Sequence, residues 1–178
     1  MRKLQISFLL GILLCLAPAY TIGNETGLAN TETTTNARKN VSDWYIRDFH
    51  SQIVVNQNSS LDITEKITAD CGNAKNKHGI FRILPETYNL NGNTVKSHVE
   101  LISITDFYGN PLKYTATRNV LDNTVIWKIG DTNKTVQGVN HYQIKYRIKN
   151  ALRFDNNNFD ELYWNILGNF WELEIDKF

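Results

Sequence analysis

The fold is decided by a stretch in which apolar and polar residues alternate without a break, His141-Tyr142-Gln143-Ile144-Lys145-Tyr146-Arg147-Ile148. Successive side chains of a β-strand point to opposite faces of the sheet, so a period of two sends one set inward and the other into solvent. We expect the tyrosines and isoleucines to face the core, and the histidine, glutamine, lysine and arginine to face water. The stretch therefore predicts a strand with one buried face.

Similar runs precede this one along the chain. Apolar residues alternate or cluster over residues 49–55, 61–67, 99–105, 112–117 and 124–129. Residues that favour turns separate several of them, and the first two runs flank a short polar turn that predicts a β-hairpin. No stretch keeps a helical period. Several short strands between turns predict an all-β domain, a β-sandwich of general immunoglobulin-like architecture.

The chain also alternates at its close. Leu173 and Ile175 fall on one face of an expected strand, with Glu172 and Glu174 on the other. Because the chain stops at Phe178 inside this pattern, we expect the domain to be truncated at its C-terminal strand.

The first residues follow the order of a secretory signal peptide. A positive start precedes an apolar run over residues 6–16, and the small residues Ala17 and Ala19 suit a signal peptidase. The apolar run is well short of the roughly 20 residues that a membrane-spanning helix needs. We therefore expect a signal peptide over residues 1–19 and an extracytoplasmic protein, secreted or at the cell surface.

The next segment, residues 20–42, is polar, rich in Thr and Asn, and has no apolar period. Such a segment cannot bury enough surface to offset the entropy of ordering it. We expect a disordered leader there, followed by one domain over residues 43–178, a length that suits a single hydrophobic core.

Charge and cysteine content exclude several classes of protein. Residues 1–19 hold two basic residues and no acidic one, so residues 20–178 carry 17 Lys and Arg (19 − 2) against 18 Asp and Glu. A nearly neutral chain has no basic field for nucleic acid. Cys71 is the one cysteine outside the signal peptide, so no intrachain disulfide is expected. We expect Cys71 to be a small buried hydrophobe rather than a nucleophile.

The most distinctive short block is His78-Gly79-Ile80-Phe81-Arg82-Ile83-Leu84-Pro85. One interpretation is a ligand-binding loop, in which Gly79 allows a tight backbone path and Arg82 offers a fork to a carboxylate or phosphate. The other is a structural loop, in which Phe81 plugs the sandwich and Arg82 pairs with an acid such as Glu65 or Asp160. We favour the structural interpretation, because ion-paired arginines are common at the ends of such folds without any ligand.

Aromatic residues form the other candidate site. Tyr163 and Trp164 are neighbours, so on a strand they face opposite ways and one of the two is expected to be exposed. Exposed rings can stack on sugars, although at this spacing they more often belong to a sheet core. The histidines outside the block are scattered without metal-ligand spacing. We expect no catalytic constellation, no metal and no cofactor, and hence no enzyme.

Several blocks of the chain together resemble a known family. They are residues 58–65, 78–85, 129–131, 142–146 and 160–165, with Gly168 and Trp171. In this order they resemble the N-terminal domain of YciQ-like predicted membrane proteins (domain of unknown function 2207). The resemblance implies a signal peptide, an extracytoplasmic β-rich domain and membrane-spanning helices further along, so membrane anchoring is expected only in a longer form. It implies no established activity and no catalytic residues.

Two functions from different classes remain open at this point. The first is a non-enzymatic extracytoplasmic domain that interacts with envelope proteins, without binding nucleic acid. The alternative is a carbohydrate-binding or glycan-acting module. The first predicts that most Trp and Tyr rings are buried, and the second predicts coplanar exposed rings beside polar groups.

Overall fold

The computed structural model describes residues 3–7, 44–90, 92–154, 159–168 and 170–178 of the chain. Within these ranges every regular element is a β-strand, which confirms the all-β prediction. In the same ranges no helix is long and apolar enough to cross a membrane. The expected leader over residues 20–42 and the cleavage point after Ala19 lie outside the described residues.

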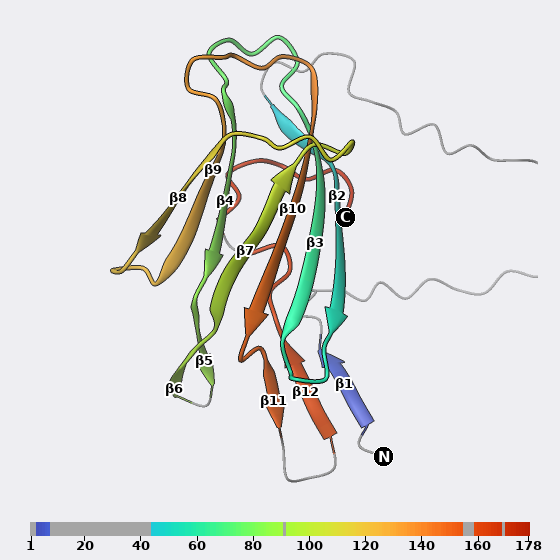
Figure 1. The fold of residues 1–178 in the computed structure, drawn as a ribbon, viewed down its shortest axis with the longest axis vertical. Helices are drawn as coiled ribbons and strands as arrows, with labels where there is room; N and C mark the ends of the chain where they lie inside the picture. The colour runs from blue at the N-terminus through green and yellow to red at the C-terminus, as the bar shows by residue number, and fades with distance from the viewer. Residues whose placement is uncertain (1–2, 8–43, 91, 155–158, 169) are drawn as a thin grey trace, which may run out of the picture.

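The strands form two larger sheets and two small ones (Figure 1). Their bounds are β1 (Lys3–Ser7), β2 (Tyr45–Val55), β3 (Leu61–Asp70), β4 (Gly79–Pro85), β5 (Thr87–Leu90), β6 (Asn93–Lys96), β7 (His98–Thr105), β8 (Tyr114–Asn119), β9 (Thr124–Gly130), β10 (Val139–Lys149), β11 (Leu152–Phe154) and β12 (Phe159–Tyr163). The large sheet has the order β2-β3-β10-β7, and the second sheet has the order β4-β9-β8. The small ones are β1-β12-β11 and the hairpin β5-β6.

The expected runs of alternation fall on strands of the two larger sheets, except that residues 112 and 113 precede β8. They lie in β2, β3, β7, β8, β9 and β10, and β2 and β3 pair as the predicted antiparallel hairpin. In β10, Ile144 and Tyr146 are fully buried while Lys145 is exposed, as the alternation requires. The block 79–85 is a strand, β4, and not the expected loop. It pairs along its whole length with β9, a non-local contact that its own sequence does not indicate.

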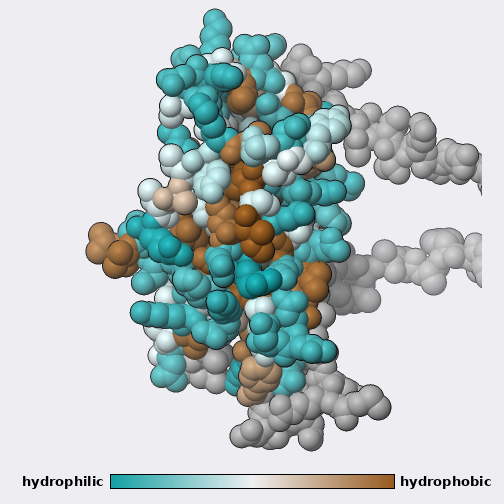
Figure 2. All heavy atoms as spheres, viewed as in Figure 1, coloured by the Kyte–Doolittle hydropathy of each residue, from teal (hydrophilic) through white to brown (hydrophobic). Residues whose placement is uncertain are grey.

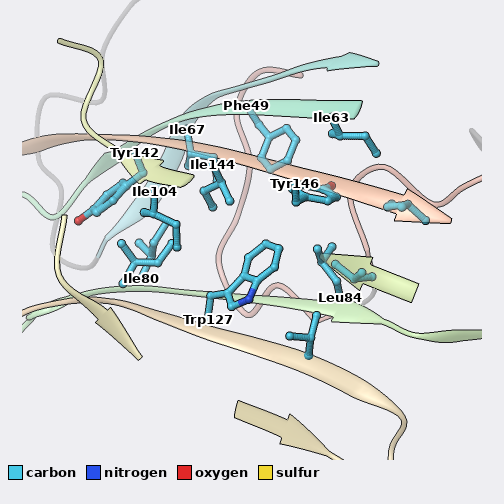
Figure 3. Packing of buried hydrophobic residues seen from close by; sticks show 14 of the residues in the cluster. Phe49, Ile63, Ile67, Ile80, Leu84, Ile104, Trp127, Tyr142, Ile144 and Tyr146 are labelled. Carbon is cyan, nitrogen blue, oxygen red and sulfur yellow. The ribbon is translucent and has the colours of Figure 1, made fainter. Parts of the chain in front are cut away.

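The core lies between the two larger sheets. Figure 3 shows Phe49, Ile63, Ile144 and Tyr146 pointing from the large sheet toward Trp127 of the second sheet. The rings of Trp127 and Tyr146 lie 5.4 Å apart between centroids. Burial of such large rings stabilises the described part of the chain, in which Cys71 is free and forms no disulfide.

The strand order differs from that of an immunoglobulin domain. If β2, β3, β4, β7, β8, β9 and β10 are called A to G in chain order, the two sheets read ABGD and CFE. Immunoglobulin constant domains read ABED and CFG. Relative to an immunoglobulin domain, the fifth strand (β8) and the seventh strand (β10) have thus exchanged sheets. The reason is that the connection from β7 to β8 and the connection from β9 to β10 both cross from one sheet to the other.

The C-terminal segment does not form the predicted strand. Residues 172–175 are irregular and make one isolated parallel bridge, between Ile175 and Ile46 of β2. The alternation of burial is nevertheless present, since Leu173 and Ile175 are half-buried and Glu172 and Glu174 are exposed. The backbone hydrogen bonds of this segment go to Ile46 and Phe49, on the two sides of a register shift in β2 between residues 46 and 48.

At the other end of the chain, β1 pairs in parallel with β12. These residues belong to the segment expected to be a signal peptide, and its removal stays a prediction. On the surface, the tip of the β8–β9 hairpin carries Val120 and Leu121, which are 82% and 92% exposed and form the apolar knob at the left of Figure 2.

Candidate functional site

A charged cluster lies inside the core, where β3, β4 and β10 face one another. Arg82 and Glu65 are 1% and 0% exposed. The Arg82 Nε donates to Glu65 Oε2 at 2.8 Å, and its Nη2 donates to Glu65 Oε1 at 2.5 Å. The hydroxyl of Tyr146 donates to the same Oε1 at 2.6 Å. The cluster is therefore a bidentate buried ion pair with a phenol as its third member.

The same arginine holds the C-terminal segment. Its Nη1 donates to the carbonyl oxygen of Leu167 at 3.0 Å, and its Nη2 donates to that of Ile166 at 2.9 Å. The guanidinium carbon lies 5.6 Å and 5.4 Å from the ring centroids of Phe49 and Trp171. Residues about 85 positions apart in sequence are thus joined through one side chain.

The protonation states in this cluster follow from burial and from the neighbouring charge. Burial disfavours the guanidinium cation, but the charge and hydrogen bonds of Glu65, with a contribution from Tyr146, together outweigh it and raise the pKa of Arg82 above its ordinary value. Burial and then the Glu65 charge raise the pKa of Tyr146 well above 10. The arginine is therefore always charged and the phenol always neutral under physiological conditions. With every group satisfied and enclosed, the cluster has a structural role.

The predicted pairing of Arg82 with an acid is thus present, and the acid is Glu65. The expected role of Phe81 is wrong, because its side chain is 52% exposed. The reason is the strand itself. Alternation along β4 turns residues 80, 82 and 84 inward and residue 81 outward.

The start of the block does line a pocket. A cavity of about 350 Å³ lies at the end of the molecule where β4 begins and β9 ends, toward the top of Figure 1. The residues around it are Trp44, Asn76, Lys77, His78, Gly79, Ile80, Phe81, Lys128, Ile129, Gly130 and Thr132. We call it the His78 pocket. Of the predicted site residues, it brings together His78 and Gly79.

Two glycines allow the backbones to meet at this pocket. Gly79 and Gly130 are cross-strand partners, with φ of +144° and +136°. A Cβ on Gly79 would lie 1.8 Å from the carbonyl oxygen of Ile129, and one on Gly130 would lie 1.9 Å from that of His78. Neither position can hold another residue without a backbone shift. Gly79 therefore allows the tight backbone path that was expected of it, but the path runs between two paired strands rather than through a loop.

The polar side chains of the His78 pocket are those of two lysines, a histidine, an asparagine and a threonine. The Nδ1 of His78 lies 2.9 Å from the carbonyl oxygen of Lys134, which can only accept, so this nitrogen carries the hydrogen. The ammonium of Lys77 lies 5.0 Å from the Trp44 ring centroid, and that of Lys128 lies 5.7 Å from the Phe81 ring centroid. No carboxylate lines the pocket among the described residues. It is an apolar recess with a cationic rim.

The pocket also includes residues that sequence reasoning missed. Trp44, Lys77 and Lys128 belong to no pattern in the sequence that would single them out. Phe81 and Lys128 are cross-strand partners, so their stacking depends on the pairing of β4 with β9. No local signal could have found that pairing.

A second cavity, of about 390 Å³, lies on the other side of His78 and also includes Asp106, Asp131 and His141. Its acids are already engaged. Lys113 donates to Asp131 at 2.7 Å and lowers the pKa of that carboxyl. Asn110 also donates to Asp106 and lowers the pKa of the Asp106 carboxyl. Hence both carboxylates of this cavity already have partners.

Tyr163 and Trp164 lie away from the His78 pocket. Tyr163 is 40% exposed and Trp164 packs against the core, so one of the two rings is exposed, as predicted. The Tyr163 ring lies 5.4 Å from that of Tyr88 with a tilt of 32° between planes. Tyr88 also lines a cavity of about 550 Å³ with Arg153 and Phe154.

Metal and thiol chemistry find little support in the described part of the chain. No group of three or more His, Cys, Asp or Glu side chains converges there to hold a metal ion. Cys71 is fully buried, as predicted. Burial, and then the charge of Asp70, raise the pKa of its thiol, which makes it a poor nucleophile.

Comparison with known proteins places the chain in a family. It is 30% identical over 131 residues to the uncharacterized protein YciQ of Escherichia coli (strain K12), which covers 72% of this chain and 20% of YciQ. The chain thus corresponds to about a fifth of the length of that relative. No solved structure matches the chain. The family model described as "Predicted membrane protein (DUF2207) N-terminal domain" matches residues 45–178, and the chain therefore belongs to this family.

Proposed function

We propose that this chain forms an extracytoplasmic domain of a membrane protein and acts there as a non-enzymatic binding domain. The family description and the signal-like order of the first residues support the location. We also propose that the two packed sheets make a β-sandwich, immunoglobulin-like only in its general two-layer architecture. Its loops at one end are then the natural place for binding.

The observation that carries the binding role is the His78 pocket. It combines apolar and aromatic walls with a few polar groups, which is the usual composition of a ligand site. The hydrogen bond of His78 goes to a backbone carbonyl, and among the described residues no hydroxyl or thiol is bonded to its ring. Among the described residues, His78 therefore has no hydroxyl or thiol nucleophile that it could activate as a base.

The location can be tested by fusing reporters to Phe178. Alkaline phosphatase fused there should be active and green fluorescent protein dark, because the former matures only after export. Deletion of residues 1–19 should reverse both signals. A bright fluorescent fusion of the intact chain would refute the extracytoplasmic location. Substrate turnover that is lost in His78→Ala would refute the non-enzymatic role.

Carbohydrate binding is the second candidate, and the Tyr88–Tyr163 pair favours it. The two rings lie beside a cavity with amide and guanidinium groups from Asn150 and Arg153. Against it, the two planes are tilted rather than coplanar, and all four tryptophans are at least half-buried. Binding on a glycan array that is lost in Tyr163→Ala, but kept in Tyr114→Ala at an equally exposed tyrosine, would support it.

A further inference from the structure

We propose that β8 is a docking edge for a second copy of this chain, which pairs with it strand against strand, antiparallel and centred on Ala116. The proposal goes beyond the binding role of the His78 pocket and uses none of its residues. It follows from the exposure of β8, from the backbone groups along its outer side, and from a sequence that complements itself in this register.

The other three edges of the two larger sheets carry segments of the same chain. The C-terminal segment bonds to Ile46 of β2. Gly168 lies against β4, because a Cβ on it would lie 3.7 Å from the carbonyl oxygen of Ile83. The loop after β7 turns back onto that strand, where Leu112 N donates to Ile104 O at 3.1 Å. Proteins cover their sheet edges in such ways because an open edge pairs with other chains.

β8 is the remaining edge, and it is open. It ends its sheet and is the outermost strand at the left of Figure 1. Residues 114–118 are all exposed, so the other described residues cover neither face of the strand. Tyrosine and threonine favour strands, and β8 contains no proline that would prevent pairing. An edge of this kind is a template for one more strand.

The backbone groups along the outer side of β8 have no partner among the described residues. Gly130 N donates to Lys113 O at 2.8 Å, which fixes the alternation of the ladder between β8 and β9. In an antiparallel pair every second residue exchanges hydrogen bonds, so residues 114, 116 and 118 point their N–H and C=O groups away from β9. Three donors and three acceptors, one of each per residue, therefore face solvent in a row.

The sequence of β8 is complementary to itself in this register. When two copies run antiparallel about Ala116, Ala116 meets its counterpart, and Tyr114 of each copy meets Arg118 of the other. All three are residues with outward backbone groups, so the new ladder can use every one of these groups. A tyrosine ring opposite a guanidinium is a favourable cross-strand pair, and no like charges are opposed. Arg118 suits this contact, because its bonds to Glu86 hold a side chain that is still 53% exposed.

The same register gives the exposed apolar tip of the β8–β9 hairpin a partner. Val120 and Leu121 are 82% and 92% exposed and project into solvent at the left of Figure 2. Continued past the strand, the pairing places them next to Leu112 and Pro111 of the second copy, which are half-buried and exposed in one copy alone. Burial of these apolar side chains would add to the stability that the backbone bonds provide.

The first experiment follows the mass of the full chain over a range of concentrations by sedimentation equilibrium. The variants are Ala116→Lys and Ala116→Asp, because the residue at the centre of the pairing meets its own counterpart. Each variant alone opposes two like charges, whereas an equimolar mixture of the two opposes a lysine and an aspartate. The matched control is Thr94→Lys, which adds the same charge at an exposed residue of β6.

We expect a monomer that associates into a dimer as the concentration rises, since one added strand makes a small interface. Each charge variant alone should dimerise at least about tenfold more weakly, and the mixture should restore the dimer to within about threefold. Thr94→Lys should stay within about twofold of the unmodified chain. A dimer that is indifferent to both charge variants, or one that the mixture does not restore, would overturn the pairing about Ala116.

The second experiment tests the register by disulfide trapping. Ala116→Cys should give a covalent dimer under mild oxidation, because a hydrogen-bonded cross-strand pair holds its Cα atoms about 5.5 Å apart. Thr117→Cys is the matched control, since Thr117 would face Thr115 of the second copy. Cys71 is 0% exposed and does not compete. Equal trapping of the two variants would overturn the register. A chain that stays monomeric at every concentration would overturn the second copy as the occupant and leave the edge to a strand of another protein.

Discussion

Replacing Arg82 by methionine tests the role of the buried cluster most directly. The change keeps much of the side-chain volume but removes the charge, so Glu65 loses both of its guanidinium bonds while it stays 0% exposed. Breaking a buried ion pair from one side costs about 3–5 kcal/mol. The carbonyl groups of Ile166 and Leu167 lose a donor as well, at about 1–3 kcal/mol for each that stays dry. We therefore expect a loss of at least about 4 kcal/mol in the free energy of unfolding.

The measurement is urea denaturation of the full chain at neutral pH, read by tryptophan fluorescence. The matched control is Arg147→Met, because Arg147 also binds a carboxylate twice, Asp62 at 2.6 Å and 3.0 Å, but at a site about 40% exposed. Exposed pairs contribute only about 0–1 kcal/mol. The double variant Arg82→Met/Glu65→Leu should recover part of the loss, since no charge is left unpaired. A loss below about 1 kcal/mol for Arg82→Met would refute the structural role.

Three further predictions concern the strands and the cluster. Ile144→Ala should cost about 2–4 kcal/mol of unfolding free energy through lost burial, while Lys145→Ala should stay within about 0.5 kcal/mol, and equal losses would contradict the register of β10. Gly79→Ala should lower the unfolding free energy by more than about 2 kcal/mol, because its Cβ meets a backbone oxygen; an unchanged denaturation midpoint would contradict the close approach. Stability should fall as the pH rises above about 10, because the unfolded chain then releases the phenol proton that Tyr146 keeps when folded; a pH titration in which Tyr146→Phe falls just as steeply would contradict this.

Much of the fold could be predicted from the sequence because its strands are amphipathic. The alternation in β10 and β3 reports burial directly, since each strand has one face in the core. Glu65 lies on the buried face of β3 between apolar residues, where a carboxylate requires a partner. The pairing with Arg82 could be proposed because β4 contains the one distinctive block of the chain.

The rest depended on contacts between distant segments. β4 was taken for a loop, and its inward and outward faces became definite only through its pairing with β9. The His78 pocket likewise joins residue 44, residues 76–81 and residues 128–132. The C-terminal residues have a strand-like pattern but make a single bridge to β2, next to its register shift. Local periodicity reports which residues are buried, but not which segments lie side by side.

The parallel bridge between Ile46 and Ile175 has a mechanical consequence. Near it, Ile46 N donates to Glu174 O at 2.8 Å, Asp176 N to Ile46 O at 2.9 Å and Phe49 N to Lys177 O at 2.8 Å. Because the two segments run in the same direction, a force that pulls residues 44 and 178 apart acts along both of them. These bonds are then loaded together in shear rather than opened one after another. Earlier in the chain, Arg82 holds the carbonyl groups of Ile166 and Leu167 in the core. Tension applied between residues 44 and 178 is therefore borne first by the bonds of residues 174–177 to β2.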